Sequence, residues 1–418
     1  MATAKAVKKM MLLEGDAPQR EALNLTEGMP DGNITSPLPG TSLFSQIKDS
    51  QPDCLFIDGD LPDEAAFQAM ADVRNNPEME ATKVVLLTAD VSEAGRNKAY
   101  AHGADAVMLK PYTLDDLLDT EQTLDRFRVS FWGTRGTLPV PGERSLKYGG
   151  NTSCVSIQIG RDRHFIFDAG TGLRNFSRDI MATTGGRFSG SIFISHPHWD
   201  HFNCLPFFAP FYIPGNRIRL YGPAQGKSTL RNLIDAQMNG VFFPITVEEF
   251  RADVEFHDVA EGEHRFDGVR IISKRLRHPG HCLAYKVEHA GRTVAYVTDN
   301  ELGDLAEDDP YIQEMVEYLK GVDVLIHDTT YFDDEYPSKV NWGHSSIGQV
   351  VRLAHAADVD RLYLFHHDPE HADQDIDRKL QVARALVTEL GSRVDCVIAI
   401  EGETYELGVS RLASQRLG

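Results

Sequence analysis

The stretch His196-Pro197-His198-Trp199-Asp200-His201 places four side chains of the metal-binding type within six residues. The largely apolar run 191–195 comes directly before it and predicts a buried strand that ends where the motif begins. Imidazole and carboxylate groups at this density are typical ligands of zinc-class ions. The motif therefore predicts a metal site at a strand end, with two ions if other parts of the chain supply further ligands.

The pattern of a strand followed by His or Asp recurs along the rest of the chain. Apolar runs end at Asp168, His278, Asp299, the pair His327-Asp328 and the pair His366-His367. A single residue of this kind is usually a loop residue or a hydrogen-bonded core histidine. A whole series of them predicts a rim of ligands along one edge of layered sheets.

The motif, together with His278, Asp299 and His366, resembles the metallo-β-lactamase superfamily of binuclear metallohydrolases, over residues 127 to 410. It is most similar to the phosphodiesterase branch, which includes tRNase Z and the phosphoribosyl cyclic phosphodiesterases. The local matches are FWGTRGT at 131–137 with GGNTS at 149–153, LRH at 276–278, and IHD at 326–328 with GHSS at 343–346. The resemblance implies an αββα sandwich.

The resemblance also implies two divalent metal ions, Zn or Mn, with Fe as an alternative. One ion would be held by His196, His198 and His278, the second by Asp200, His201 and His366, and Asp299 would bridge both.

Three further residues are expected near these ligands. Asp168 would hydrogen-bond a ligand histidine and orient it. His281 is expected either behind a ligand or in contact with substrate. His367 is an alternative ligand to His366, which the strand register favours.

The predicted chemistry is hydrolysis of a phosphodiester, in which two bound cations activate a water molecule and clamp the phosphate oxygens. The catalytic set is Asp200 with the candidate proton donor His344 and its partner Asp328, which would fix the tautomer of the imidazole. The alternative is that His344 only precedes a helix over 347–355 whose start is capped by serines.

The first 125 residues carry a different pattern. Short apolar runs end at Glu14, Asp58, Thr88 and Lys110, and helical patterns over 63–74 and 92–101 lie between them. Strands that alternate with helices predict a doubly wound parallel sheet with its functional residues at the carboxyl ends of the strands.

This pattern resembles the receiver domain of response regulators. Asp58 matches the phosphoacceptor, Thr88 the switch hydroxyl and Lys110 the phosphate-contacting lysine. The usual acidic pair is replaced by Glu14-Gly15 with Asp16 following, and Val107 stands where an aromatic switch residue is usual. Two alternatives stay open, namely a switch phosphorylated by a histidine kinase with Mg²⁺, and a domain used only for docking or homodimer formation.

Composition agrees with two α/β domains, which we place at 1–125 and 126–418. The formal net charge of 42 − 62 = −20 disfavours a broad nucleic-acid or membrane surface without excluding a local basic cleft. The five scattered cysteines are typical of reduced thiols, and the longest apolar runs are too short to span a membrane, so we expect a cytoplasmic protein.

Three functions fit the sequence. The leading hypothesis is a binuclear metal-dependent phosphodiesterase for a small or cyclic phosphodiester, such as a cyclic nucleotide, under receiver control. The second is a tRNase Z-like endoribonuclease. The third is a non-catalytic, metal-stabilised signalling module. Aromatic residues between His201 and His278 are expected to pack mostly in the core, with one or two lining the substrate site.

Overall fold

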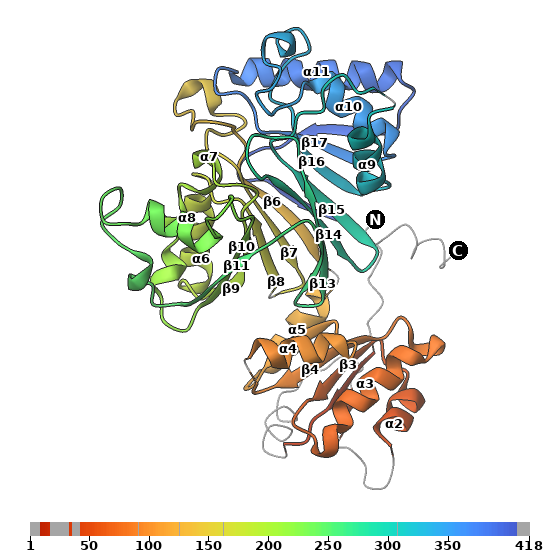
Figure 1. Ribbon diagram of the computed structural model, residues 1–418. Helices are drawn as coiled ribbons and strands as arrows, with labels where there is room; N and C mark the ends of the chain where they lie inside the picture. The colour runs from red at the N-terminus through yellow and green to blue at the C-terminus, as the bar shows by residue number, and fades with distance from the viewer. Residues whose placement is uncertain are drawn as a thin grey trace. The chain divides into compact units, whose positions relative to one another are not determined.

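The computed structural model describes residues 9–16, 33–35 and 42–407, apart from 91, 125, 162 and 307. It forms two compact units, one of Met1–Arg126 with Arg265–Gly268 and one of Phe127–His264 with Val269–Gly418 (Figure 1). The predicted domain boundary includes residue 125, which lies outside the described residues. Within the described ranges, every helix is too short or too polar to cross a membrane.

The first unit is built on a parallel five-stranded sheet in the order β2-β1-β3-β4-β5. Its strands are β1 (Met10–Leu13), β2 (Asn33–Thr35), β3 (Cys54–Asp58), β4 (Lys83–Thr88) and β5 (Ala106–Leu109). The inner strands β1, β3 and β4 are almost continuously apolar, because helices cover both of their faces.

Four helices of this unit are described: α2 (Leu43–Ser50), α3 (Ala65–Asn75), α4 (Glu93–Ala101) and α5 (Leu114–Thr123). Side chains of α2, α3 and α4 join one apolar cluster, and α5 joins the cluster on the other face of the sheet. The predicted doubly wound sheet is therefore confirmed, with α3 and α4 beginning one or two residues later than the helical patterns suggested.

The second unit contains two mixed seven-stranded sheets, apart from Arg265 and Phe266 at the end of one edge strand, which are grouped with the first unit. The first has the order β11-β10-β9-β8-β7-β6-β19. Its strands are β6 (Phe127–Gly133), β7 (Cys154–Ile159), β8 (Arg163–Phe167), β9 (Ser189–Phe193), β10 (Arg217–Gly222), β11 (Asp253–Asp258) and β19 (Thr404–Glu406).

The second sheet has the order β12-β13-β14-β15-β16-β17-β18. Its strands are β12 (Gly262–Phe266), β13 (Val269–Arg275), β14 (Leu283–His289), β15 (Arg292–Val297), β16 (Val324–Asp328), β17 (Arg361–Phe365) and β18 (Asp395–Ile398). The sequence predicts a strand over 322–326 that ends before His327-Asp328, but the observed strand is shifted, so that both residues form the end of β16 rather than the loop after it.

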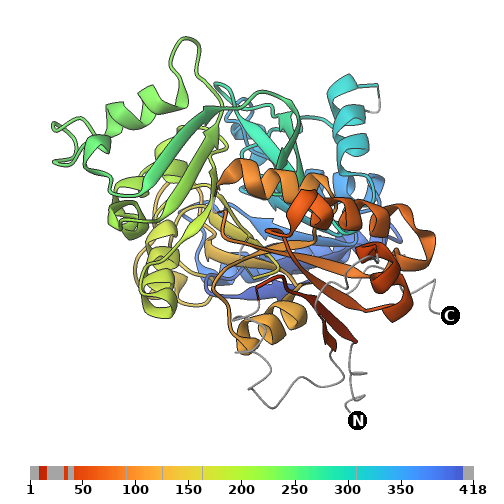
Figure 2. The same ribbon diagram turned by 90° about the horizontal axis from the view of Figure 1, so that it is seen from below.

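Each sheet is covered by helices on its outer face (Figure 1 and Figure 2). The outer clusters contain side chains of α6 (Leu173–Thr184) and α8 (Leu230–Gln237) on the first sheet, and of α9 (Pro310–Leu319), α10 (Ile347–Ala356) and α11 (Asp373–Glu389) on the second.

Aromatic rings fill the space between the two sheets. The ring of Phe167 on β8 lies 5.5 Å from that of Phe193 on β9 and 5.8 Å from that of Tyr285 on β14, measured between centroids. Ile166, between Phe165 and Phe167, joins the outer cluster instead, as the period of two along a strand requires. The αββα sandwich is thereby confirmed.

Candidate metal centre

The predicted ligands and Asp168 come from five strand ends that meet along one edge of the sandwich. Asp168 follows β8, the 196–201 motif follows β9, His278 follows β13, Asp299 follows β15 and His366 follows β17. The pairs β8–β9, β15–β16 and β16–β17 are parallel, so within each sheet these strands end at the same edge. The short helix α7 (Trp199–Phe202) turns the chain directly after His198 and carries Asp200 and His201.

The first cluster contains His196, His198, His278 and Asp299, whose potential ligand atoms all lie within 4.8 Å of one another. Nδ1 of His198 lies 2.8 Å from Nε2 of His196 and 3.1 Å from Nε2 of His278. Oδ2 of Asp299 lies 3.5 Å from Nε2 of His196. His198 is exposed, so this cluster is open to solvent on one side.

The second cluster contains Asp200, His201 and His366, all of them buried. Nε2 of His366 lies 3.3 Å from Nε2 of His201 and 3.3 Å from Oδ2 of Asp200. Asp299 contributes its other oxygen here, because Oδ1 lies 3.0 Å from Nε2 of His366 and 3.3 Å from Nε2 of His201. One carboxylate oxygen therefore faces each cluster, which is the arrangement of a bridging ligand.

The spacing of these atoms fits a pair of small divalent ions. Nitrogen ligands about 2.0–2.1 Å from a tetrahedral ion are about 3.3 Å apart from one another. Within each cluster, neighbouring ligand atoms lie 2.8 to 3.6 Å apart. Burial lowers the pKa of His196 well below its ordinary value and so favours the neutral imidazole, the form that binds metal. The histidines and aspartates are thus arranged for a binuclear metal site.

Asp168 holds one ligand from behind. Its Oδ2 lies 2.7 Å from Nδ1 of His201 and also accepts hydrogen bonds from the hydroxyls of Ser195 and Tyr296. Its Oδ1 accepts from the backbone N–H of Ser195 at 2.7 Å. A proton on Nδ1 leaves Nε2 of His201 free for a metal. The sequence suggested the role of Asp168, but gave no sign of Tyr296, which comes from the opposite sheet.

Three residues of the site adopt left-handed backbone conformations, with φ of 60° at Asp168, 52° at Asp299 and 56° at His366. Each is the first or second residue after a strand. Such a conformation is uncommon for residues other than glycine and costs on the order of 1–3 kcal/mol. The surrounding sandwich therefore holds these side chains toward the clusters at the expense of local backbone stability.

The predicted pair of His344 and Asp328 lies against the clusters. Nδ1 of His344 is 3.3 Å from Oδ2 of Asp328, and the fully buried Asp328 also accepts from the backbone N–H groups of Asn300 and Ser345 at 2.8 and 3.0 Å. Burial lowers the pKa of His344, but the carboxylates of Asp299 and Asp328 outweigh it and raise that pKa to about 9. The arrangement favours an imidazolium that can donate a proton.

Two other interpretations of His344 have structural support. Ser346 caps α10 with its side chain, so His344 does precede a capped helix start. His344 also forms a third potential ligand group with Asp299 and His366. Its ring stacks on that of His366 with 5.0 Å between centroids. Measuring the metal content of a His344 variant distinguishes the two roles, because loss of a ligand lowers the metal content and loss of a proton donor does not.

The two ambiguous histidines lie in different surroundings. His281 contacts the loop that carries Gln225, because its backbone N–H donates to Oε1 of Gln225 and its Nδ1 lies 3.2 Å from the carbonyl of Ala224. His367 is fully buried, and among the described residues neither of its ring nitrogens has a hydrogen-bond partner. The structure thus brings His366, and not His367, to the clusters.

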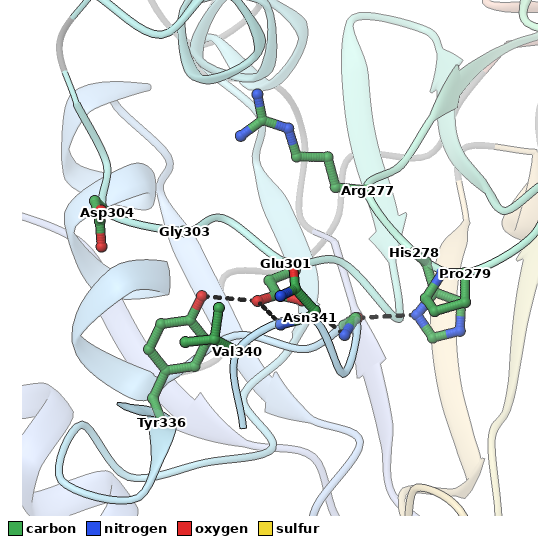
Figure 3. A pocket seen from close by; sticks show the side chains of 10 residues that line it. Arg277, His278, Pro279, Glu301, Gly303, Asp304, Tyr336, Val340 and Asn341 are labelled. Atoms are coloured by element: carbon green, nitrogen blue, oxygen red, sulfur yellow. Dashed lines mark hydrogen bonds between the residues drawn. The ribbon is translucent and has the colours of Figure 1, made fainter. Parts of the chain in front are cut away.

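Sequence reasoning missed Glu301, which organises the loop before His344 (Figure 3). Its carboxylate accepts hydrogen bonds from the backbone N–H groups of Asn341 at 2.7 Å and Gly343 at 2.8 Å, and from the hydroxyl of Tyr336 at 2.9 Å. The carbonyl of Gly343 in turn lies 3.0 Å from Nδ1 of His278. The available signal was an acid two residues after Asp299.

In the receiver unit, the predicted residues gather at the carboxyl edge of the sheet. Nζ of Lys110 lies 2.5 Å from Oδ1 of Asp58 and 3.3 Å from Oε1 of Glu14. The backbone N–H of Gly15 donates to Asp58 at 3.0 Å, and Thr88 is buried one strand away on β4. Burial raises the pKa of Asp58, but hydrogen bonds to Glu14 and Lys110 outweigh it and lower that pKa.

The remaining acidic residue is placed differently. Asp16 is exposed, and its backbone N–H donates to Oε1 of Glu14 at 2.9 Å. The other oxygen of Glu14 accepts from the hydroxyl of Tyr112, a buried residue that the sequence did not single out. The pKa of Glu14 is raised above its ordinary value, mainly because its carboxyl group is buried.

Comparison with known families agrees with this geometry. Residues 163–367 match the model of the beta-lactamase superfamily domain, and residues 13–121 match that of the response regulator receiver domain. Ribonuclease Z of Thermoplasma acidophilum is 28% identical over 284 residues, which cover 60% of this chain and 89% of that protein. Ribonuclease Z of Halalkalibacterium halodurans is 25% identical and covers 61% of this chain and 93% of that protein.

Among solved structures, a diphosphatase from the PhnP family is 18% identical with a TM-score of 0.48, and covers 68% of this chain and 97% of that one. The ligand clusters, the two sheets and both family matches lead to the same assignment. The chain contains a domain of the metallo-β-lactamase superfamily, which follows an N-terminal response regulator receiver domain.

Proposed function

We propose that this protein is a binuclear metal-dependent phosphodiesterase that hydrolyses small or cyclic phosphodiesters. The observation that carries the proposal is the position of the His344–Asp328 pair beside Asp299, whose carboxylate faces both ligand clusters. Zn or Mn fits the mixed nitrogen and oxygen ligands, with Fe as an alternative. When bound, two such ions activate a water molecule and stabilise the charge that develops on the phosphate.

The side chains of the site would then supply the proton for the leaving group and balance the charge of the ions. His344 protonates the departing alkoxide, because a poor leaving group needs a proton as its bond to phosphorus breaks. Asp328 keeps the proton on Nδ1 and stabilises the imidazolium before transfer. Asp200 and Asp299 supply negative charge that compensates the bound cations.

A second candidate is a ribonuclease Z-like endoribonuclease. It is favoured by the curated relatives, which carry that name and match along most of their length. The net charge of −20 disfavours it, because binding to a polyanion depends on many phosphate contacts with Lys and Arg.

The test is a panel of substrates incubated with the purified full chain and Mn²⁺ or Zn²⁺. The panel contains bis-p-nitrophenyl phosphate, cyclic mononucleotides, cyclic dinucleotides and precursor tRNA. Faster turnover of small diesters than of tRNA supports the first proposal. Efficient tRNA cleavage without activity on any small diester refutes it in favour of the second.

We further propose that the receiver unit regulates or assembles the hydrolase. Support comes from Lys110, which lies within hydrogen-bonding distance of Asp58 at the sheet edge. A histidine kinase would be the partner of a phosphorylated Asp58 with Mg²⁺, and a second copy of this chain would be the partner if the unit serves only in dimer formation.

A further inference from the structure

We propose that a cavity beside His278 binds the uncharged nucleoside part of the substrate, and that Asp304 and Asn341 select this group. The inference rests on the proposed phosphodiesterase function and narrows its substrate class to esters of a single nucleoside phosphate. Apart from His278, the predicted metal ligands do not line this cavity.

The cavity has a volume of about 460 Å³ and lies between three segments of the second unit (Figure 3). These segments are 277–279, 301–304 and 336–343. The volume falls within the range of about 300–1,000 Å³ that is usual for small-molecule sites. One of its walls is His278, which also belongs to the first ligand cluster. A phosphoryl group held at that cluster would therefore have one ester substituent at the cavity.

The charge of the lining argues against a second phosphate. Among the described residues that line the cavity, Arg277 is the one Lys or Arg, and its guanidinium donates two hydrogen bonds to Asp309, of 2.6 and 2.7 Å. Its charge is thus already compensated. Glu301 and Asp304 add two carboxylates to the lining. A second phosphate would meet like charges there, whereas an uncharged group would not.

The polar atoms of the lining instead suit hydrogen-bond donors. Asp304 is exposed and offers carboxylate oxygens, and Asn341 offers an amide. Glu301 uses three of its roughly four acceptor positions on Tyr336, Asn341 and Gly343. Ribose hydroxyls and the exocyclic amines of bases are donors of this kind.

The cavity also has an apolar wall. Tyr336 and Val340 both line it, and Val340 is 48% exposed. A planar base is a suitable partner for such a wall, because small-molecule sites combine apolar surface with a few polar groups that fix orientation. Donors on a sugar and the flat face of a base together describe a nucleoside.

The experiment compares two kinds of substrate on the metal-loaded full chain. A 2′,3′- or 3′,5′-cyclic mononucleotide carries the nucleoside, and bis-p-nitrophenyl phosphate does not. The variants are Asp304→Ala and Asn341→Gly. Glycine is chosen because the φ of Asn341 is 69°, which glycine adopts without strain. Asp179→Ala, on an exposed site of α6 outside the cavity, is the control.

We expect Asp304→Ala to raise the KM for cyclic mononucleotides about 10-fold or more, the effect of a lost hydrogen bond to a charged group. Its kcat, and both constants for bis-p-nitrophenyl phosphate, should stay within about twofold, because the reacting groups are untouched. Asn341→Gly should act in the same direction. Equal effects on the two substrates, or none in either variant, would overturn the subsite.

A charge reversal provides an independent measurement. Asp304→Lys should favour a nucleotide with a second phosphate, so that the ratio of its kcat/KM to that of the cyclic mononucleotide rises about 10-fold or more. An unchanged ratio contradicts the charge argument.

A binding measurement tests the nucleoside subsite independently of the proposed phosphodiesterase activity. If no diester is hydrolysed, the phosphodiesterase is refuted, and the subsite is tested by calorimetric titration of the metal-loaded protein with adenosine monophosphate. Weaker binding in Asp304→Ala than in wild type and Asp179→Ala supports the subsite. Identical affinities, or no binding by any of the proteins, reject it.

Discussion

The carbonyl oxygen of Gly343 lies 3.0 Å from Nδ1 of His278, although 65 residues separate the two in the chain. This contact favours a proton on Nδ1 and leaves Nε2 free toward the first ligand cluster. Gly343 has a φ of 85°, and a Cβ there would lie 2.2 Å from Nδ1 of His278. The loop before His344 therefore positions a predicted ligand as well as the predicted acid, and Glu301 fixes that loop.

The first prediction concerns Glu301. Glu301→Ala leaves two backbone N–H groups and the Tyr336 hydroxyl without their acceptor, which should cost about 1–3 kcal/mol for each donor that stays buried. We expect a lower melting temperature, a weaker metal site at His278 and a loss of activity. Glu301→Gln keeps one oxygen acceptor and should be milder, and Tyr336→Phe should be milder still. Equal metal affinity in Glu301→Ala and wild type contradicts the role in positioning His278.

The second prediction concerns Asp299, whose two oxygens face different clusters. Asp299→Ala removes the shared carboxylate and should weaken both metal sites. Elemental analysis after gel filtration measures the result. A full two equivalents of metal in the variant would show that another residue bridges the ions.

The third prediction concerns His344. If it protonates the leaving group, His344→Ala should lower the rate on an alkoxide-releasing substrate roughly 10²–10⁴-fold, with little change for a p-nitrophenolate ester, which needs less proton assistance. Metal content should stay at the wild-type value. Loss of metal from the variant instead assigns His344 to the ligand group with Asp299 and His366.

The fourth prediction concerns Asp58. Acetyl phosphate with Mg²⁺ should label wild type slowly and Asp58→Ala not at all, because Gly15 removes one carboxylate from the usual acidic pair. Phosphorylation alters activity or assembly only if the phosphorylated form favours one of two arrangements. Labelling, oligomeric state and diesterase rate are compared in the two proteins. Identical rate and assembly with no labelling reduces the receiver unit to a docking domain.

The sequence alone determined the local features of this protein, namely most of its strands and the ligand residues that follow them. Alternation of apolar residues and the His or Asp at each strand end are properties of short segments, so β8, β15 and β17 could be predicted nearly to the residue. The sequence predicts a strand over 191–195, but β9 ends at Phe193, two residues earlier. The ligands that the resemblance implied are brought within contact distance of one another. A second local difference is at His327-Asp328, where pairing of Asp328 with Phe365 of β17 moves the end of the strand two residues further along the chain.

The tertiary structure alone decided the contacts between segments that are distant in the chain. Glu301 with Gly343, Tyr296 with Asp168 and Tyr112 with Glu14 are pairs of polar groups brought together by strand order and loop course. The cavity beside His278 likewise needs three loops at once. Side-chain periodicity reports which face of an element is buried, but it carries no information on which distant hydrogen-bond partner satisfies a buried polar group.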